Sequence, residues 1–410
     1  MTVPPASAPI PVSLRRLFPG ASFVGCGDIV AVDAMERSDA CRPGCLFAAL
    51  PGTNLHGSMF VPEAVARGAT SLLTDRPLPH VNLPQCIVRN ARPAFALLCQ
   101  TLAGWPSRQL GIAGVTGTNG KTTTAWLARS ILRYAGRQTG LLGTIENHSG
   151  DQAAPAVPAA LTTPDARTLA QWLAAAVSCG ATHLALELSS HALAQGRAAG
   201  MLLDVAIVTN ITQDHFDYHG SFEAYRAAKR ELISLLKRRG LLVLNANDPG
   251  SRSLLGETPA HARCLTFGID CDADLVATNL RPSEHGTSFT ISNGLSAADV
   301  ESRLLGRHNV ENCLAAAAAG LHFGLSLTEI AGGIAALECV PGRLQSIDCG
   351  QPFRVLIDYA HTEDALRRVL QTVRATTQGR VICGFGAGGD RDCSQRPGIG
   401  VAGSHADLVG

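Results

Sequence analysis

The sequence predicts an α/β fold of about three domains, and three observations lead to this prediction. The chain has 410 residues, which is room for about three domains of ordinary size. Apolar runs typical of strands alternate with helical periodicity along most of its length. A glycine-rich segment, residues 114–124, separates one such strand from a helix and has the spacing of a phosphate-binding loop.

The glycine-rich segment reads Gly-Val-Thr-Gly-Thr-Asn-Gly-Lys-Thr-Thr-Thr. Residues 110–115 predict a buried strand before the turn, and the apolar residues after it recur at helical spacing. In such a turn backbone N–H groups and the helix N-terminus face phosphate, Lys121 reaches the outer phosphates and Thr122 ligates Mg²⁺. Val115 stands where the usual pattern has glycine. We predict that this segment binds a nucleoside triphosphate.

Composition narrows the classes of function. The formal net charge is +1, so the chain has no basic excess with which to hold nucleic acid. Its 13 cysteines are an odd number without a Cys-x-x-Cys pair, which favours reduced thiols in a cytosolic protein. Residues 1–12 read as a flexible tail and not as a signal peptide. The longest apolar run, residues 313–325, is too short to span a bilayer. We expect a cytoplasmic protein without nucleic acid or membrane partners.

Residues 1–105 form the first predicted domain, a small α/β unit. Strands are predicted at residues 22–32, 45–50 and 71–74, and a helix at 60–67. Taken alone, this unit indicates no particular chemistry.

Residues 106–338 form the second predicted domain, a sheet wound with helices. A strand over residues 182–188 carries Glu187, and a strand over 205–208 leads to His215. Ligands of parallel sheets bind at the carboxyl ends of strands, where both residues and the phosphate loop fall. Glu187 suits a Mg²⁺ carboxylate, with an ordinary charge at a strand end as the alternative. His215 and His219 lack the glutamate of a zinc motif, so an ordinary hydrogen-bonded loop histidine is an equal alternative.

The remainder of this domain is predicted from periodicity and turn residues. The basic run 229–239 predicts the solvent-exposed face of a helix that ends at Gly240. Lys229 is therefore expected at the surface. Residues 264–292 show alternation typical of strands, and residues 304–312 open an alanine-rich helix. Asn309 at that helix start also fits an ordinary cap.

Residues 339–410 form the third predicted domain, with strands at 353–357 and 381–384 and a helix at 364–373. A doubly wound domain normally needs about 100–150 residues, so we expect this one to be incomplete, with an exposed sheet edge.

Ten motifs, in the family's order, resemble those of the Mur ligase family, and the resemblance covers the chain from about residue 20 to the end. They are Gly117-Thr118-Asn119-Gly120-Lys121-Thr122-Thr123, Gly143-Thr144-Ile145, Leu161-Thr162-Thr163-Pro164-Asp165, Glu187-Leu188-Ser189-Ser190-His191, Asp214-His215-Phe216-Asp217-Tyr218-His219-Gly220, Tyr225-x-x-Ala228-Lys229, Gly306-x-x-Asn309-Val310-x-Asn312, Gly342-Arg343, Asp358-Tyr359-Ala360-His361 and Gly388-Gly389-Asp390-Arg391-Asp392.

The resemblance implies a central P-loop ATPase-type sheet, a Rossmann-like C-terminal domain and an ADP-forming ligase of peptidoglycan synthesis. ATP phosphorylates the D-glutamate carboxylate of UDP-N-acetylmuramoyl-L-alanyl-D-glutamate, and the amine of a diamino acid displaces phosphate. We expect meso-diaminopimelate, or otherwise L-lysine, and a monomer. The family segment that selects this amino acid would lie beyond Gly410.

The resemblance also implies roles for single residues. The catalytic set is Lys121, Glu187, His215 and Lys229. Thr122 and Glu187 would hold one Mg²⁺. A second Mg²⁺ would be held by Glu187, His215 and Lys229, with Lys229 modified by CO₂ to a carbamate. ATP would contact Gly117, Thr118, Asn119, Gly120, Lys121, Thr122, Thr123, His308, Asn309, Arg343 and Asp358. The two other substrates would contact Ser38, Thr162, Thr163, Ser189, Gln195, Arg197 and Arg391.

Two alternatives stay open. The family's Asp-Ser-Arg in the first domain reads Arg37-Ser38-Asp39 here, which points to an impaired homologue that binds nucleotide or muramoyl peptide without turnover. A folate polyglutamate ligase shares the fold, but residues 162–165 and 217–219 speak against it. A GTPase is disfavoured because no Asn-Lys-x-Asp motif occurs.

Overall fold

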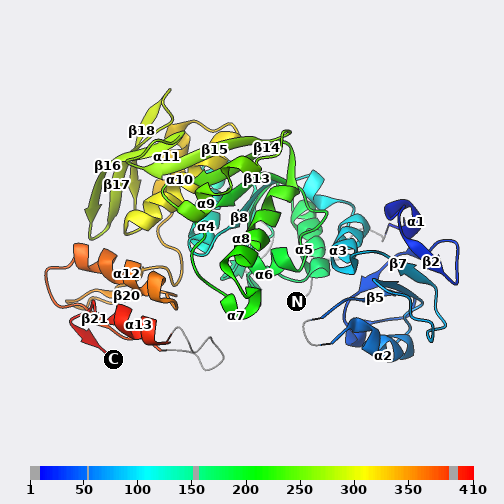
Figure 1. Cartoon of the computed structure of the whole chain (residues 1–410). Coiled ribbons are helices and arrows are strands. Elements are labelled where there is room, and N and C mark those ends of the chain that lie inside the picture. Colours follow the sequence, from blue (N-terminus) through cyan, green and yellow to red (C-terminus); the bar gives the residue numbers. More distant parts are fainter. Residues whose placement is uncertain (1–9, 53–54, 151–156, 387–395) are drawn as a thin grey trace.

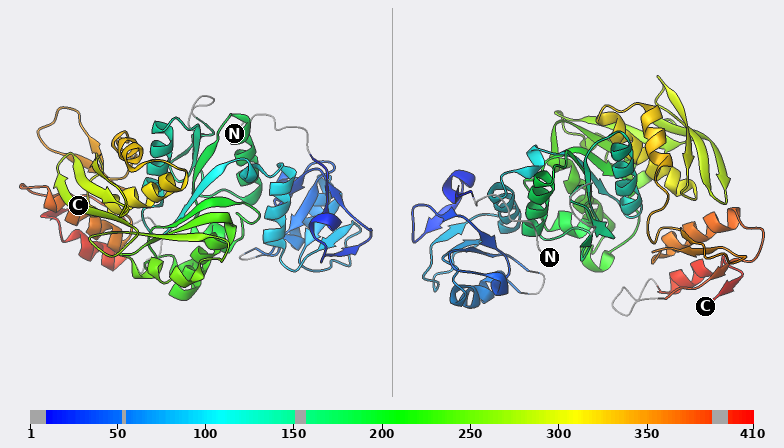
Figure 2. Two further views of the ribbon diagram at one scale, coloured as in Figure 1. Left: turned by 90° about the horizontal axis from the view of Figure 1, so that it is seen from above. Right: turned by 180° about the vertical axis from the view of Figure 1, so that it is seen from behind.

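A computed structural model describes residues 10–52, 55–150, 157–386 and 396–410 (Figure 1). Three α/β units follow one another along the chain. The N-terminal unit (blue) and the C-terminal unit (orange to red) lie at opposite ends of the central unit (Figures 1 and 2). None of the described helices is long and apolar enough to cross a membrane.

The N-terminal unit contains a five-stranded sheet in the order β2-β7-β6-β5-β4. The strand predicted at residues 22–32 is wrong, because Gly25, with a φ of 75°, turns the chain after β2 (Ser22–Val24). The later part of that segment instead forms β3 (Val30–Ala31), which pairs with β1. The other elements are β1 (Val12–Ser13), α1 (Leu14–Leu17), β4 (Ala34–Met35), β5 (Leu46–Ala49), α2 (Val61–Ala66), β6 (Ser71–Thr74), β7 (Gln85–Ile87) and α3 (Ala91–Leu102).

The central unit is built on a nine-stranded sheet in the order β18-β17-β16-β15-β14-β13-β8-β12-β9. Within this sheet β9, β12, β8, β13, β14, β15 and β16 are parallel, and β17 and β18 continue the sheet antiparallel. The strands are β8 (Gly111–Thr116), β9 (Thr139–Leu142), β12 (His183–Glu187), β13 (Leu203–Val208), β14 (Leu236–Asn245), β15 (Arg263–Ile269), β16 (Leu275–Ser283), β17 (Gly286–Ser292) and β18 (Ala297–Ser302).

Helices cover both faces of this sheet, so two apolar cores form. One core packs under α4 (Lys121–Tyr134), α10 (Arg307–His322) and α11 (Leu327–Ala335). The other lies under α5 (Ala166–Ser178), α6 (Ser190–Ala194) and α8 (Phe222–Arg230). The short elements β10 (Glu146–Asn147), β11 (Val157–Pro158), α7 (Phe216–His219) and α9 (Pro249–Arg252) lie in the connections. Burial on both faces is what a parallel sheet requires.

The basic run at residues 229–239 does not form one exposed helix. Helix α8 ends at Arg230, and β14 begins at Leu236, so Gly240 lies within a strand. Lys237 donates from Nζ to the Asp204 carboxylate at 2.7 Å and to the carbonyl of Leu110 at 2.8 Å. Partners distant in sequence therefore override the local helical pattern.

The C-terminal unit places its predicted strands and helix as expected. Strand β20 (Val355–Ile357) pairs antiparallel with β19 (Gln345–Ile347), and β21 (Ile382–Cys383) pairs parallel with β22 (Leu408–Val409). A small core of five buried residues lies under α12 (Glu363–Ala375) and α13 (Arg396–Gly403): Leu366, Leu370, Val381, Ile399 and Ala402.

Helix α11 packs closely on the phosphate-loop helix α4 through Gly333. The hydroxyl of Ser130 donates to the carbonyl of Gly333 at 2.7 Å, and a Cβ at Gly333 would overlap the Cα of Ile131. A backbone atom cannot move aside without shifting α4.

Gly333→Ala should therefore lower the free energy of unfolding by about 1–3 kcal/mol, because the overlap outweighs the helix propensity that alanine adds. Urea unfolding measures this loss. Gly256→Ala is the control, since nothing lies within 4 Å of its added Cβ. Equal destabilisation by both variants would contradict the packing argument.

Candidate active site

The phosphate loop joins the carboxyl end of β8 to α4 and is braced from β13. Asn119 donates its backbone N–H to the side-chain oxygen of Asn210 at 2.8 Å, and the Asn210 amide donates to the carbonyl of Asn119 at 3.0 Å. Gly120 has a φ of 87°, and a Cβ there would collide with the side chain of Asn312. Only glycine fits that position, so the loop keeps its shape before any ligand binds.

Lys121 folds back over the loop. Its Nζ donates to the carbonyl of Gly117 at 2.8 Å and to that of Thr118 at 3.0 Å. Burial lowers the pKa of this amine, and the nearby Glu187 carboxylate opposes that shift. A phosphate would give this buried amine an anionic partner in place of two carbonyls.

Glu187 ends β12 and is fully buried. Its Oε2 accepts from the hydroxyls of Thr122 and Thr144, each at 2.9 Å, and its Oε1 accepts from the backbone N–H of Thr144 at 2.7 Å. These partners are uncharged. A carboxylate beside a threonine hydroxyl is a donor set that suits Mg²⁺.

Glu187 is held close to the phosphate loop by Gly143, where a Cβ would collide with Oε1. Thr144 was not among the predicted site residues. Its only signal in the sequence was the Gly143-Thr144-Ile145 motif.

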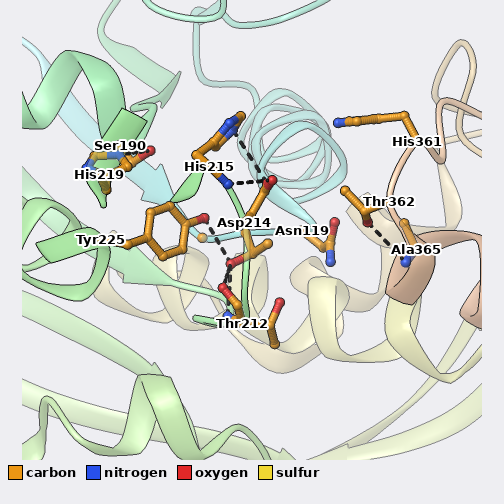
Figure 3. Close-up of polar contacts among 12 residues, drawn as sticks. Asn119, Ser190, Thr212, Asp214, His215, His219, Tyr225, His361, Thr362 and Ala365 are labelled. Atoms are coloured by element: carbon orange, nitrogen blue, oxygen red, sulfur yellow. Dashed lines mark hydrogen bonds and ion pairs between the residues drawn. The ribbon is translucent and has the colours of Figure 1, made fainter. Parts of the chain in front are cut away.

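Three histidines gather beside the loop that follows β13, and we call His191, His215 and His219 the histidine cluster. Figure 3 shows two of them, His215 and His219. The ring centroids of His191 lie 4.8 Å from His215 and 5.5 Å from His219. Burial, with the neighbouring histidines as further causes, lowers the pKa of His191 to about 4. His215 has a φ of 54°, and its Nε2 lies 3.5 Å from Oδ2 of Asp214. His191 and Asp214 are additional site candidates.

Lys229 is 1% exposed, so its predicted place at the surface is wrong. It occupies the inward face of the short helix α8, and its Nζ lies 4.5 Å from the ring centroid of Tyr225. Burial holds the pKa of Lys229 well below its usual value, with Lys121 as the next cause. The chain contains 3 lysines against 31 arginines, and two of these lysines lie here.

A cavity of about 1530 Å³ lies between the central unit and the C-terminal unit. Its lining includes most of the predicted site residues: Thr118, Asn119, Gly120, Lys121, Thr122, Thr123, Thr162, Thr163, Ser189, Arg197, His215, Lys229, His308, Asn309, Arg343 and Asp358. Glu187 lies directly behind Thr122 and Thr144 of this lining.

The C-terminal unit reaches the phosphate loop with polar side chains. Arg343 donates from Nη2 to the hydroxyl of Thr122 at 3.2 Å, and Asn119 donates to the Asp364 carboxylate at 3.4 Å. Thr362 caps the N-terminus of α12, near Asn119 (Figure 3). Asp358 accepts from the backbone N–H of Leu344 and Ala360, at 2.8 and 2.7 Å.

The start of α10 forms another wall of the cavity. Asn309 is 3% exposed and donates to the carbonyl of Leu305 at 2.8 Å, while Gly306 is the capping residue. The alternative of Asn309 as an ordinary helix cap is therefore wrong. Burial lowers the pKa of His308 to about 4.

Some predicted substrate residues form a connected group. Arg197 donates from Nη1 to the carbonyl of Thr163 and from Nε to the side chain of Gln195, both at 2.9 Å. Thr163 in turn accepts from the backbone N–H of Ser189 at 3.0 Å.

Ser38 stands apart from this group. It lies in the N-terminal unit, where its hydroxyl donates to Glu63 at 2.7 Å, and it does not line the cavity. Beside it, Arg37 donates from Nε to Asp39 at 3.0 Å. Arg391 lies outside the described residues.

The predicted metal ligands are brought together only in part. Thr122 and Glu187 are hydrogen-bonded, whereas His215 pairs with Asp214 and Lys229 faces Tyr225. Within the described ranges, no group of three or more His, Cys, Asp or Glu side chains could hold a metal ion.

Comparison with known proteins gives a consistent family signal. The model of the Mur ligase middle domain matches residues 115–320, and that of the Mur ligase glutamate ligase domain matches residues 342–409. The UDP-N-acetylmuramoyl-L-alanyl-D-glutamate–2,6-diaminopimelate ligase of Geobacillus kaustophilus (strain HTA426) is 42% identical over 392 residues, covering 94% of this chain and 78% of that protein. The UDP-N-acetylmuramyl-tripeptide synthetase of Roseiflexus sp. (strain RS-1) is 38% identical over 390 residues, covering 91% and 76%.

Solved structures agree. One UDP-N-acetylmuramoyl-L-alanyl-D-glutamate–2,6-diaminopimelate ligase matches with a TM-score of 0.75 and 29% identity, covering 98% of this chain and 82% of that one. Folylpolyglutamate synthase of Mycobacterium tuberculosis has a TM-score of 0.65 at 21% identity, covering 77% and 78%. At that identity only the fold is shared.

Glu36 follows β4 at the border with the central unit. Burial first, and the Asp165 carboxylate second, raise its pKa to about 7, while Arg92 and Arg197 oppose the shift. Its Oε1 is buried and has no hydrogen-bond partner among the described residues.

Between pH 4.5 and 7 the unfolded chain releases a proton that folded Glu36 retains, so this group lowers stability as pH rises through that window. Glu36→Gln should remove this loss. We compare the free energy of unfolding of the variant with that of the wild type at each pH. The difference in favour of the variant should be about 2 kcal/mol larger at pH 8 than at pH 5. Urea unfolding at both pH values measures this, and parallel pH curves would contradict the buried carboxyl.

Proposed function

This chain belongs to the Mur ligase family, and on that basis we propose that it joins a diamino acid to UDP-N-acetylmuramoyl-L-alanyl-D-glutamate at the expense of ATP. We take meso-diaminopimelate as the amino acid, in line with the names of its relatives, with L-lysine as the other candidate. The observation that carries the proposal is the shared cavity. Phosphate-loop residues, the buried Lys229 and the Arg197 group all line it.

The reaction has two steps. An oxygen of the substrate carboxylate attacks the γ-phosphorus, the bond to the β,γ-bridging oxygen breaks, and ADP leaves. The amine then attacks the acyl carbon, the bond from that carbon to the phosphate oxygen breaks, phosphate leaves with its electron pair, and the amine gives up a proton. The first step brings two anions together, so the site must supply positive charge.

The chain supplies that charge from both sides of the cavity. Lys121 would exchange its two loop carbonyls for phosphate oxygens, and Arg343 already lies 3.2 Å from Thr122 of the loop. Thr122 and Glu187 would hold one Mg²⁺, which would supply positive charge between the carboxylate and the phosphate. His308 and Asn309 would contact the adenine, and Asp358 the ribose.

We propose that Lys229 carries a carbamate. Its neutral amine attacks the carbon of CO₂, an N–C bond forms, one C=O electron pair moves to oxygen, and a proton leaves the nitrogen. The buried position and lowered pKa of Lys229 support this step, because only the neutral amine is nucleophilic. The new carboxylate would join Glu187 and His215 around a second Mg²⁺.

The other parts of the chain have matching roles in this proposal. The first domain, residues 1–105, would hold the uridylated end of the substrate near Ser38, and the central domain, 106–338, would hold its peptide near Thr162 and Ser189. The third domain, 339–410, would bind the incoming amino acid through Arg391. We propose a cytoplasmic monomer.

One observation favours the impaired homologue as second candidate. Arg37 and Asp39 bond to each other, and Ser38 is bonded to Glu63, so none of the three is directed at the cavity. Phosphate release by purified protein separates the candidates. Release that requires ATP, Mg²⁺, the muramoyl dipeptide and diaminopimelate or lysine supports the ligase, whereas nucleotide binding without release supports the homologue.

Lys121→Ala should lower the rate of phosphate release by about 100-fold or more, because it removes a cation that faces the transferred phosphoryl group. Lys237→Arg is the control, since Lys237 bonds Asp204 at the opposite end of the sheet and should keep its ion pair. The rate of the control should stay within about twofold of the wild type. An unchanged rate for Lys121→Ala would exclude the proposed phosphate contact.

A further inference from the structure

Helix α8 presents two buried polar side chains, Tyr225 and Lys229, to the site. They are four residues apart, so they lie one above the other on the same face of the helix. Tyr225 is 1% exposed, as is Lys229.

The hydroxyl of Tyr225 reaches the phosphate loop. It lies 3.0 Å from Oγ1 of Thr118, which donates to the carbonyl of Thr212 at 3.2 Å and accepts from the backbone N–H of Thr212 at 2.9 Å (Figure 3). Thr118 has one hydroxyl hydrogen, so all of these contacts are hydrogen bonds at once only when that hydrogen goes to the carbonyl of Thr212 and Tyr225 donates to Thr118.

This bond joins three segments. Thr118 belongs to the phosphate loop, Thr212 to the loop that carries Asp214 and His215, and Tyr225 to the helix that carries Lys229. Thr118 is the common partner, so a shift of the phosphate loop would break hydrogen bonds to both of the other segments.

The ring of Tyr225 faces in the other direction, toward the amine. The Nζ of Lys229 lies 4.5 Å from the ring centroid, within reach of an N–H group directed at the π face. An amine that directs one N–H at the ring has its lone pair turned elsewhere. The ring also restricts the side chain of Lys229 to a narrow space.

We propose that Tyr225 is a positioning residue with two separable tasks: its hydroxyl holds the phosphate loop through Thr118, and its ring holds the amine of Lys229 for carbamate formation. The second task rests on the proposed function, because it presumes that Lys229 is carboxylated. Neither task requires Tyr225 to touch a substrate.

Two variants of one residue separate these tasks. Tyr225→Phe keeps the ring and removes the hydroxyl, whereas Tyr225→Leu removes both. The chain has only 3 lysines, so protein labelled with ¹³C at lysine Cε gives three signals, and ¹³C-bicarbonate adds a carbamate signal. These signals report on Lys229 without any need for turnover, and the KM for ATP reports on the phosphate loop.

Tyr225→Phe should keep the carbamate signal and raise the KM for ATP by about two- to tenfold, the range of one lost hydrogen bond. Tyr225→Leu should lose most of the carbamate signal at ambient CO₂ and recover part of it at high bicarbonate. A carbamate signal that is equal in the two variants, whether kept or lost, would overturn the role of the ring. An unchanged KM for ATP in Tyr225→Phe would overturn that of the hydroxyl.

The other end of the hydrogen bond gives an independent test if Tyr225→Leu does not fold. Thr118→Val should raise the KM for ATP as Tyr225→Phe does, and the double variant should be no worse than the single Thr118→Val. Additive effects would overturn the coupling. If the wild-type protein itself shows neither carbamate nor turnover, the proposed function fails, and the KM or affinity for nucleotide still decides the role of the hydroxyl.

Discussion

The burial of two amines at the same sheet edge is the constraint on which the rest of this site depends. Burial raises the cost of charge on both Lys121 and Lys229, and Lys121 adds to that cost for Lys229. The fold accommodates the two amines by giving them different surroundings. Lys121 has loop carbonyls and the nearby Glu187, while Lys229 has an aromatic face. In the proposed function, one amine would hold an anion and the other would react as a neutral nucleophile.

The units differ in how firmly they are attached, which suits this chemistry. Asp33 and Arg167 form an ion pair at 3.1 Å between the N-terminal and central units, and α3 packs on the central unit so closely that Gly200 has no room for a side chain beside Leu97. The C-terminal unit touches the phosphate loop through long polar side chains, Arg343 and Asp364 among them. Such contacts can be exchanged for a nucleotide at small cost, whereas packed apolar ones cannot.

Local pattern was enough to predict what is encoded locally. The phosphate loop, the alternation of strands and helices, and Glu187 at a strand end all follow from short stretches of sequence, and the structure places them as expected. The secondary structure of residues 229–239 could not be predicted in this way. Lys237 lies in a strand and is hydrogen-bonded to Asp204 and Leu110, which are distant in the sequence. The burial of Lys229 was missed for the same reason. Periodicity alone made it a surface residue, and only the family resemblance indicated a role. The site positions of Thr144 and Asp214, and the contacts on both sides of Tyr225, depend on how separate loops pack together. A single stretch of sequence does not predict that packing.

The central claim is that the loop between β8 and α4 receives the phosphates of ATP beside a buried carboxylate and two buried amines. A crystal structure with Mg²⁺ and a non-hydrolysable ATP analogue tests this most directly. The account predicts that Lys121 leaves the carbonyls of Gly117 and Thr118 for the phosphates, with the metal ion bound at Thr122 and Glu187. An analogue bound elsewhere, or an unchanged Lys121 in a loop without phosphate, would contradict it.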